Sequence, residues 1–444
     1  MKTEILQRIE SREAVVGIIG LGYVGLPLLL EFAKAGFPVV GFDIDAQKTD
    51  ALSQGRSYIR HISPDAIKAA FSKSSTVATT DFSRIRSCDT ILICVPTPLD
   101  QHQEPDLSFI ESTARTMAPH IRQGQLISLE STTYPGTTEE VLAGILDAGS
   151  GLTAGSDYFL AYSPEREDPN NSNFSTSTIP KVVGGINPDA LEVAQALYNS
   201  VICTTVPVSS CSAAEATKLM ENIFRCVNIA LVNELKVVFT RMGIDIWEVV
   251  EAAKTKPFGF MPFYPGPGLG GHCIPIDPFY LTWKAKEFGV TTRFIELAGE
   301  INTSMPEYVV QRTMLALNEQ QKSLKGSKIL LVGLAYKKNV DDDRESPTYV
   351  LWQMLEEKGA QVDFYDPFIP KVRPSREHSQ YAGIPSQTWE GIEQNDYDAA
   401  IISTAHDDVP HERLHEFIPV VIDTRGAARG CPGTFQACAD PMPA

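Results

Sequence analysis

The chain opens with short apolar runs separated by longer amphipathic stretches. An apolar run at Val15–Ile19 leads into a glycine-rich turn, and a helical pattern then connects to a second apolar run at Val39–Phe42. Four or five consecutive apolar residues between turn signals are typical of a strand that is buried on both faces of a sheet. Strand, helix and strand in this order predict a βαβ unit and therefore a parallel sheet.

The turn after the first strand carries a glycine fingerprint. It reads Gly20-Leu-Gly22-Tyr-Val-Gly25, and Asp43 follows 18 residues after the last glycine. Glycines at this spacing let the backbone approach a pyrophosphate at a helix N-terminus, and the acid accepts hydrogen bonds from the adenosine ribose. Lys48 could bind a 2′-phosphate, which leaves NADP open, and a glycine-rich turn in an unrelated fold is the alternative. We expect NAD, held by Gly20, Gly22, Tyr23, Val24, Gly25, Asp43 and Lys48.

Further apolar runs follow at the spacing of an α/β fold. Each ends in a polar or proline-bearing loop, and ligands of an open parallel sheet gather at the carboxyl ends of its strands. Thr97, Thr132 and Glu165 lie at such ends and are candidate site residues, although each could be an ordinary loop residue. The three runs are Thr90–Pro98, Leu126–Thr138 and Tyr158–Pro169.

The middle of the chain has a helical pattern. From Ser209 to about Lys254 the apolar residues recur at three- and four-residue spacing, which predicts one long helix that begins at Ser209 or Ser210. Such a helix can join two domains and offer an apolar face to a second copy of the chain, so we expect a homodimer. Lys218 and Asn222 are four residues apart and share one face of the helix, either as solvent-exposed residues or as part of a site.

The C-terminal third repeats the strand–turn–helix–strand pattern. Its first turn lacks the glycine fingerprint and instead carries Lys337 and Lys338, which favours a mononucleotide diphosphate over a dinucleotide. The prediction is therefore an α/β protein with two Rossmann-like, doubly wound parallel-sheet domains, joined by a long central helix and a helical middle domain. The expected bounds are 1–205, 206–310 and 311–444.

Composition narrows the possible partners and compartments. Of the 444 residues, 43% are hydrophobic and 21% are charged, as in globular proteins with more than one domain. The formal net charge of −17 argues against nucleic acid as the main partner. The N-terminal segment is unlike a secretory signal, and the longest uncharged run is shorter than the roughly 18–20 residues that span a bilayer. The eight cysteines lack metal-ligand spacing, so we expect reduced thiols, no metal, no membrane partner and a cytoplasmic protein.

One cysteine lies in an unusual segment. Residues 266–278, "GPGLGGHCIPIDP", place Cys273 among four glycines and three prolines. Glycine and proline are unfavourable inside helices and strands, so this composition predicts a shaped loop that presents the thiol to a ligand. A packed structural thiol is the alternative.

Seven motifs together resemble the UDP-glucose/GDP-mannose dehydrogenase family over nearly the whole chain. They are "GLGYVGLP", "CVPTP", "ESTTYPGTT", "SPERE", "TKLMEN", "GLGGHCIPIDP" and "GLAYKKNVDDDRESP". The resemblance implies NAD-dependent, four-electron oxidation of the C6 hydroxymethyl group of a UDP-sugar to a carboxylate, feeding surface polysaccharide biosynthesis. The His272-Cys273 pair looks most like members that use UDP-N-acetylhexosamines, UDP-N-acetylglucosamine in particular. One departure is Thr133-Tyr134, where the family pattern has Val-Pro.

The resemblance also implies roles for individual residues. Cys273 would be the nucleophile, Lys218 would stabilise negative oxygen, and Asn222 would be a second donor. Asp277 would hold or deprotonate the site water, Glu165 would be the base for thioester hydrolysis, and Thr132 would align water. The cofactor contacts would include Thr97, Thr132 and Arg344, the last of which could equally form a surface ion pair. The expected substrate contacts are Glu165, Arg166, Lys218, Asn222, Phe260, Tyr264, Gly270, Lys337 and Arg425, although Phe260 and Tyr264 could be ordinary packing.

Other functions stay open at this stage. A two-electron NAD dehydrogenase of the 6-phosphogluconate or 3-hydroxyacid type shares the opening domain and a long helix, but it needs neither the thiol nor a second nucleotide domain. A non-catalytic nucleotide-sugar sensor would have no use for Cys273, Lys218, Asn222 and Asp277 together. The sugar is open as well, with UDP-N-acetylgalactosamine, UDP-N-acetylmannosamine and UDP-glucose as alternatives.

Overall fold

The computed structural model describes residues 1–59, 62–72, 75–100, 104–166, 176–271, 274–375, 378–431 and 434–436. It confirms the predicted α/β class, with two separate sheets of largely parallel strands. The chain divides into two compact units. The first consists of Met1–Glu221 and Phe279–Val290, and the second of Asn222–Pro278 and Thr291–Ala444.

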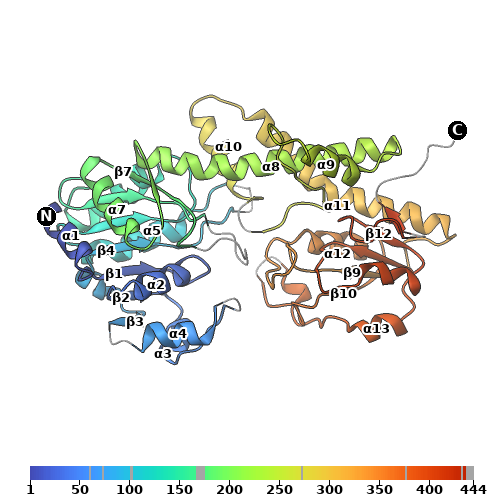
Figure 1. Ribbon diagram of the computed structural model, residues 1–444, viewed down its shortest axis with the longest axis horizontal. Helices are drawn as coiled ribbons and strands as arrows, with labels where there is room; N and C mark the ends of the chain where they lie inside the picture. The colour runs from blue at the N-terminus through green and yellow to red at the C-terminus, as the bar shows by residue number, and fades with distance from the viewer. Residues whose placement is uncertain are drawn as a thin grey trace. The chain divides into compact units, whose positions relative to one another are not determined.

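The first unit is built on an eight-stranded sheet (Figure 1). The strand order is β3-β2-β1-β4-β5-β6-β7-β8, and paired strands are parallel except for β6 and β7. The chain winds outward in opposite directions from β1 and β4, and this switch point is where doubly wound sheets bind ligands. The strands are β1 (Val16–Ile19), β2 (Val39–Phe42), β3 (Thr76–Thr79), β4 (Thr90–Ile93), β5 (Leu126–Leu129), β6 (Phe159–Tyr162), β7 (Lys181–Gly185) and β8 (Thr205–Val208).

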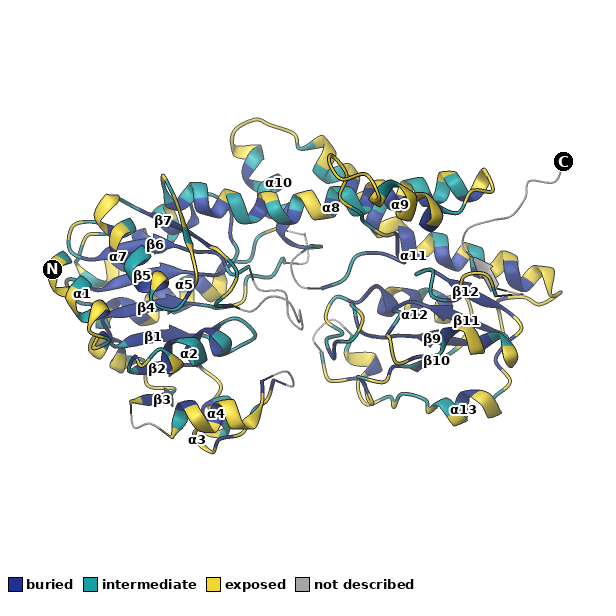
Figure 2. Cartoon of the chain, in the orientation of Figure 1, coloured by how far each residue is buried: buried dark blue, intermediate teal, exposed yellow. Residues whose placement is uncertain are grey.

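The central strands of this sheet are covered on both faces. Every residue of β1, β2, β4, β5 and β6 is buried, as the dark strands in Figure 2 show. Val16 and Ile18 pack in one core with residues of α1, α2 and α7. The helices of this unit are α1 (Lys2–Glu10), α2 (Gly25–Lys34), α3 (Ala46–Ser53), α4 (Pro64–Phe71), α5 (Ser108–Met117), α6 (Ala143–Ser150) and α7 (Pro188–Asn199), with short helical turns η1 (Phe82–Ser87), η2 (Ala118–His120) and η3 (Thr137–Leu142).

The helical middle of the chain differs from the single long helix that the pattern predicts. The helix α8 (Cys211–Arg241) has 31 residues, and its Ala213 amide donates to the Ser210 hydroxyl at 3.1 Å, so Ser210 is the cap. It ends just before Gly243, whose φ of +70° is left-handed, and α9 (Ile246–Lys254) begins anew after the capping residue Asp245. The prediction of continuous helix to Lys254 is therefore wrong, because a glycine of this conformation ends a helix.

The second unit contains a five-stranded, fully parallel sheet of order β10-β9-β11-β12-β13. Along β9, Ile329 and Leu331 face a core with α11 and α12, while Leu330 and Val332 face a core with α13 and η5. This alternation places helices on both faces, as doubly wound sheets require. Most of α10 (Asp277–Glu287) belongs to the first unit as well. The elements that follow it, in the second unit, are α11 (Arg293–Glu319), β9 (Lys328–Val332), α12 (Pro347–Glu357), β10 (Gln361–Tyr365), η4 (Ser379–Tyr381), α13 (Trp389–Gln394), β11 (Ala399–Ile402), η5 (His411–Glu416), β12 (Val421–Asp423) and β13 (Thr434–Gln436).

Within the residues that the structure describes, no helix combines the length and apolar character needed to cross a membrane.

Candidate active site

The predicted glycine turn joins β1 to α2. Gly20 has a φ of +89°, and a Cβ there would lie 2.5 Å from the carbonyl oxygen of Cys94. A Cβ on Gly25 would lie 1.9 Å from the Gly20 carbonyl oxygen, whereas a Cβ on Gly22 would meet nothing within 4 Å. The first and third glycines are thus required by the fold, and the second leaves open backbone where a pyrophosphate can approach. Tyr23 and Val24 complete the turn before α2 begins at Gly25.

Asp43 follows β2 at the same edge of the sheet. Its side chain is buried and accepts hydrogen bonds from the backbone amides of Leu21 at 2.9 Å and Asp45 at 3.0 Å. A carboxylate has about four lone-pair sites, so Asp43 retains capacity for ribose hydroxyls. Lys48 Nζ lies 3.2 Å from Asp43 Oδ2, and this pairing occupies the cation that could otherwise favour a 2′-phosphate. These residues fit NAD.

The three candidates Thr97, Thr132 and Glu165 follow β4, β5 and β6, which are parallel neighbours, so they lie along one sheet edge. The loop that carries Thr132 is fixed to α8 by Glu215, a fully buried residue that the sequence analysis missed. Glu215 accepts from the amides of Gly136 at 2.7 Å and Thr138 at 2.9 Å, and from the Thr138 hydroxyl at 2.7 Å. Burial raises the pKa of Glu215, although these hydrogen bonds oppose the shift.

The same helix also contacts the loop after β6. Lys218 Nζ donates to the backbone carbonyl of Glu165 at 2.6 Å, and Glu221 forms an ion pair with Arg166 at 2.6 Å. Residues 215, 218 and 221 are three apart, so they project from neighbouring turns on one side of α8. The structure therefore brings together Lys218, Glu165 and Arg166, which the sequence analysis placed in one site.

A buried lysine contacts the Glu165 carboxylate. Glu165 Oε1 accepts from the Arg166 amide at 2.7 Å, and Oε2 lies 3.5 Å from Lys181 Nζ. Lys181 also lies 2.6 Å from Glu130 Oε2. A small cavity, with space on the order of one water molecule, adjoins this group; it is lined by Glu165, Arg166, Thr176, Ile179, Pro180 and Lys181. Lys181 and Glu130 could not be recognised as site residues from the sequence, because Lys181 is a lone charged residue at the start of β7 and Glu130 a lone charged residue just after β5.

A second pair of predicted residues meets in the second unit. Asn222 Nδ2 donates to Asp277 Oδ2, and both side chains are buried. Lys218 and Asn222 lie one helical turn apart on α8. Burial of Asn222 argues against the interpretation as a solvent-exposed residue. Cys273, the predicted nucleophile, and His272 lie outside the described residues.

The described part of the glycine loop packs against the second nucleotide-like turn. The Gly266 amide donates to Asn233 Oδ1 at 3.0 Å, and a Cβ on Gly266 would lie 2.5 Å from Arg425 Nη1. A Cβ on Gly270 would lie 2.8 Å from the Tyr336 Cβ, and the Gly271 amide donates to the Arg344 carbonyl at 3.3 Å. The glycines thus have a packing role within this unit, in addition to the expected access of a sugar to the thiol.

The predicted diphosphate cations lie at the carboxyl edge of the second sheet. Lys337 follows β9, and Arg425 follows β12. Arg425 Nε donates to the Ser403 carbonyl at 2.6 Å, which fixes the plane of the guanidinium. Burial lowers the pKa of Arg425 to about 10, with Asp423 opposing the shift, so the group keeps its charge at neutral pH.

Three further predicted contacts are exposed or have other partners in the structure. Phe260 and Tyr264 are exposed, and the Tyr264 hydroxyl donates to Glu251 at 2.5 Å. The Arg344 guanidinium pairs with Asp342 at 2.6 Å. The substrate roles of the aromatic residues and the cofactor role of Arg344 stay predictions.

The departure at Tyr134 has a packing explanation. Its ring lies 5.0 Å from the ring of Trp283 and 6.4 Å from that of Tyr280, measured between centroids. Lys284 Nζ lies 5.1 Å from the same centroid. The aromatic side chain thus anchors α10 on the loop that carries Thr132, a contact that the smaller proline of the family pattern could not make.

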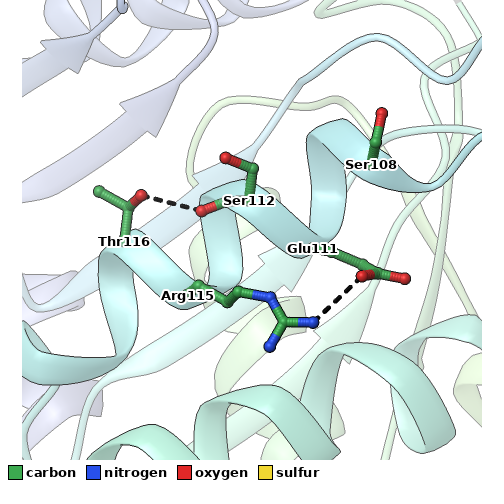
Figure 3. A pocket seen from close by; sticks show the side chains of 5 residues that line it. All are labelled: Ser108, Glu111, Ser112, Arg115 and Thr116. Atoms are coloured by element: carbon green, nitrogen blue, oxygen red, sulfur yellow. Dashed lines mark hydrogen bonds and ion pairs between the residues drawn. The ribbon is translucent and has the colours of Figure 1, made fainter.

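A surface hollow elsewhere in the first unit does not include any predicted site residue. It follows the exposed side of α5 and is lined by Ser108, Glu111, Ser112, Arg115 and Thr116 (Figure 3). Arg115 pairs with Glu111 at 3.2 Å, and the Thr116 hydroxyl donates to the Ser112 carbonyl at 2.8 Å. Both contacts lie within α5, so they support the helix and do not point to a ligand.

Comparisons with known proteins agree with this geometry. Three family models match in series: the NAD binding domain of the UDP-glucose/GDP-mannose dehydrogenase family over residues 14–202, its central domain over 212–304, and its UDP binding domain over 330–429. A UDP-N-acetyl-D-glucosamine 6-dehydrogenase of Pseudomonas aeruginosa is 37% identical, over 89% of this chain and 91% of that protein.

Other relatives carry the names of other sugars. An NDP-N-acetyl-D-galactosaminuronic acid dehydrogenase of Ralstonia nicotianae is 35% identical, over 81% of this chain and 84% of that protein. The solved structure of the UDP-D-ManNAc dehydrogenase from Pyrococcus horikoshii superposes with a TM-score of 0.85 and 32% identity, covering 94% of this chain and 97% of that one. The chain therefore belongs to the UDP-glucose/GDP-mannose dehydrogenase family.

Proposed function

We propose that the protein oxidises the C6 hydroxymethyl group of a UDP-N-acetylhexosamine, UDP-N-acetylglucosamine first among them, to the carboxylate. The chain is a UDP-sugar dehydrogenase that uses NAD, since the NAD binding domain of the family matches residues 14–202. The sugar assignment is supported by the His272-Cys273 form of the thiol loop and by the 37% identity to a UDP-N-acetyl-D-glucosamine 6-dehydrogenase. The product would feed surface polysaccharide biosynthesis.

The observation that carries the proposal is the contact between Lys218 and the Glu165 loop. Lys218 Nζ lies 2.6 Å from the Glu165 carbonyl oxygen, at the sheet edge that also carries the dinucleotide turn. The Lys218 cation and the residue that carries the Glu165 carboxylate are thus held together at this sheet edge, which supports an alcohol oxidation with later hydrolysis.

The first oxidation needs a base and a cation at the reacting oxygen. Gly20, Gly22, Gly25 and Asp43 would hold NAD⁺, which would supply the hydride acceptor for each of the two oxidations. Lys218 would stabilise the negative charge on the C6 oxygen as its proton leaves, with Asn222 as a second donor. Asp277, buried and bonded to Asn222, would hold the water that takes this proton.

The aldehyde then needs a new bond before it can lose a second hydride. The Cys273 thiolate would add to C6, and the carbonyl electron pair would move to the oxygen, which Lys218 stabilises. Loss of hydride from this thiohemiacetal leaves a thioester on Cys273. Water that Thr132 aligns and Glu165 deprotonates would attack the thioester carbon, and the thiolate would leave as the acid is released. The total is two NADH for each UDP-sugar.

Cys273→Ala tests the four-electron mechanism. The variant should form no acid, because the aldehyde has no adduct from which a second hydride can leave, although a trace of bound aldehyde is expected. Cys273→Ser should accumulate a covalent ester, since an oxygen ester hydrolyses more slowly than a thioester. Cys211→Ala, which removes a buried thiol of α8, is the matched control and should keep two NADH per substrate. NADH yield and intact-protein mass are the measurements, and near-normal acid from folded Cys273→Ala would contradict the mechanism.

The sugar assignment needs a direct comparison of substrates. UDP-N-acetylglucosamine should be turned over faster than UDP-N-acetylgalactosamine, UDP-N-acetylmannosamine and UDP-glucose, as measured by kcat/KM at equal enzyme concentration. A higher value for UDP-glucose would overturn the hexosamine assignment and leave the family unchanged.

We also propose a cytoplasmic homodimer with domains 1–205, 206–310 and 311–444. On α8, Phe224, Leu231 and Val238 are exposed by 48%, 51% and 43% and are seven residues apart, so they form an apolar stripe suited to a second copy. Leu231→Glu should convert the dimer to a monomer in light scattering. A monomeric wild type would contradict the dimer.

A further inference from the structure

We propose that Lys181 is a positioning residue that holds the Glu165 carboxylate ionised and oriented for hydrolysis. Glu130 weakens the effect of Lys181 on Glu165, because it pairs with the same ammonium group. The inference rests on the proposed function, because it concerns the base of the hydrolysis step. Lys181 begins β7, Glu130 follows β5, and Glu165 follows β6, the strand between them in the sheet.

The three charges form a buried group. Lys181 Nζ lies 2.6 Å from Glu130 Oε2 and 3.5 Å from Glu165 Oε2. The exposed fractions of the three side chains are 5% for Lys181, 0% for Glu130 and 14% for Glu165. Lys181 Nζ also donates to the Pro164 carbonyl at 3.2 Å, so the ammonium is fixed beside the backbone that precedes Glu165. Glu165 is the most exposed member of the group, and it lines the small cavity together with Lys181.

The charge states follow from this arrangement. Burial opposes the charge of Lys181, but Glu130 and Glu165 outweigh it and raise the pKa of Lys181 above its ordinary value. Burial raises the pKa of Glu130, and Lys181 opposes that shift. The Tyr198 hydroxyl donates to Glu130 Oε1, which satisfies the second oxygen of this carboxylate. Lys181 therefore stays cationic across the neutral range, and its charge is divided between two carboxylates.

The other groups around Glu165 have different partners. Lys218, on α8, contacts the Glu165 backbone carbonyl, and the guanidinium of Arg166 is turned to Glu221. Burial raises the pKa of the Cys94 thiol, which follows β4, so this neighbour is neutral near pH 7. The phenol of Tyr198 on α7, whose pKa burial also raises, stays neutral as well. Within the described part of the chain, Lys181 is a cation that contacts the Glu165 carboxylate itself, with Nζ 3.5 Å from Oε2.

The hydrolysis step requires the Glu165 carboxylate to be ionised. As a water oxygen bonds to the thioester carbon, one water proton moves to the Glu165 carboxylate and the carbonyl electron pair moves to oxygen. When the tetrahedral species collapses, the carbon–sulfur bond breaks and the electron pair leaves with sulfur as the Cys273 thiolate. Glu165 can accept the proton only if it enters the step ionised.

The shared cation predicts shifts of opposite sign. Glu130→Gln removes the competing negative charge, so Lys181 acts on Glu165 alone and hydrolysis should remain active to lower pH. Replacing the whole pair, in the double variant Lys181→Met with Glu130→Gln, leaves Glu165 without its cation. The acid limb of the pH–rate profile for hydrolysis should then shift to higher pH by about one unit or more, because an adjacent opposite charge lowers a carboxyl pKa by about one to three units. A role in packing alone would not produce opposite shifts.

The test is a series of single-turnover reactions with NAD⁺ and UDP-N-acetylglucosamine at different pH values. Each reaction is quenched, and the covalent thioester is measured by intact-protein mass spectrometry. The double variant should accumulate the covalent thioester near neutral pH, where the wild type does not. Lys181→Arg should keep the wild-type profile, since it keeps the charge. Lys2→Met is the control: Lys2, on α1 outside the site, is also paired with two carboxylates, Asp189 at 2.7 Å and Glu192 at 2.6 Å, and its loss should leave the profile unmoved.

The outcomes separate this inference from the proposed function. In one outcome, the wild type yields two NADH per sugar, and the acid limb of the pH–rate profile is unmoved in both Glu130→Gln and the double variant. This outcome overturns the role of Lys181 and leaves the proposed function standing. One NADH per sugar in the wild type overturns the proposed function and this inference together. Glu130→Gln keeps Lys181 paired with Glu165, so it provides a folded variant even if the double variant does not fold.

Discussion

The two nucleotide-type sheets use the same turn for different purposes. In each, a glycine with φ near +90° follows the first strand: Gly20 at +89° after β1, and Gly333 at +90° after β9. In each, an acid after the second strand accepts a hydrogen bond from the backbone amide of the residue after this glycine: Leu21 donates to Asp43 at 2.9 Å, and Leu334 donates to Asp366 at 2.7 Å.

The difference lies in what fills the turn. Asp366 is fully buried, and besides Leu334 it accepts from the amides of Ala335, Phe368 and Ile369 and contacts His406 at 3.1 Å. Its oxygens are committed to the protein, whereas Asp43 has fewer partners, and Gly22 leaves its turn open. One strand–turn–acid pattern can therefore build an open dinucleotide turn or a filled structural turn, and the difference depends on the residues beside it.

The largest expected effect comes from adding a methyl group to either first glycine. A Cβ would lie 2.5 Å from the Cys94 carbonyl oxygen at position 20, and 2.4 Å from that of Thr404 at position 333. Gly20→Ala and Gly333→Ala should each cost about 3 kcal/mol of unfolding free energy or more, from backbone strain and collision. Calorimetry should show lost NAD binding for Gly20→Ala and lost UDP binding for Gly333→Ala. Loss of the opposite ligand in either variant would break the comparison.

Replacing each of the two acids by asparagine should affect different quantities: NAD binding for Asp43 and the free energy of unfolding for Asp366. Asp43→Asn should weaken NAD binding by about 1.5–3 kcal/mol, because charged hydrogen bonds to ribose are lost, with a small change in unfolding. Asp366→Asn should lower the unfolding free energy by about 2 kcal/mol, since buried amides lose their acceptor, and should leave the Kd for NAD unchanged. Urea unfolding and NAD titration measure the two quantities. A gain of NADP efficiency in Asp43→Asn would sharpen the assignment of Asp43 to the ribose.

Gly22→Ala tests the open turn directly. Nothing lies within 4 Å of the added methyl group, so stability should change little, while the Kd for NAD should rise by about tenfold because the methyl group occupies the approach of the pyrophosphate. Gly144→Ala on α6 is the matched control, since it also has open space around the new Cβ. Unchanged NAD affinity in Gly22→Ala would mean that the second glycine has no role in the cofactor site.

The smallest effect is a change in acid stability. Burial opposes the charge of Asp366, but His406 and the amides of Ala335 and Phe368 outweigh it and lower the pKa of Asp366. A lowered folded pKa stabilises the protein above the unfolded value of about 3.9 and loses that contribution as pH falls through the folded pKa. The gap in unfolding free energy between wild type and Asp366→Asn should therefore be constant above about pH 5 and narrow below about pH 4. A gap that widens on acidification would contradict this sign.

The sequence pattern predicts the parts of the fold and site that depend on local order. Strand β2 begins and ends where the pattern places it, and the glycine turn and Asp43 lie where the spacing predicts. Thr97, Thr132 and Glu165 reach one sheet edge because consecutive parallel strands end there.

Contacts between distant charges were not predictable in this way. Glu215 binds a loop 77 to 79 residues away in sequence, and the partners of Lys181 come from two other strands. In sequence, Lys181 is only a charged residue at the start of an apolar run. The end of α8 was also missed, because the apolar spacing continues past Gly243 while the backbone reverses its φ there.

The anchoring of α10 on Tyr134 has a consequence for synthesis. The first compact unit is discontinuous, since it includes Met1–Glu221 and returns for Phe279–Val290. A nascent chain that has emerged only to residue 221 lacks Tyr280, Trp283 and Lys284, the residues that cover the Tyr134 ring. Because domains fold as units during translation, this one stays incomplete on the ribosome until residue 290 has emerged. The glycine loop that carries Cys273 is therefore made before the unit that binds NAD can close.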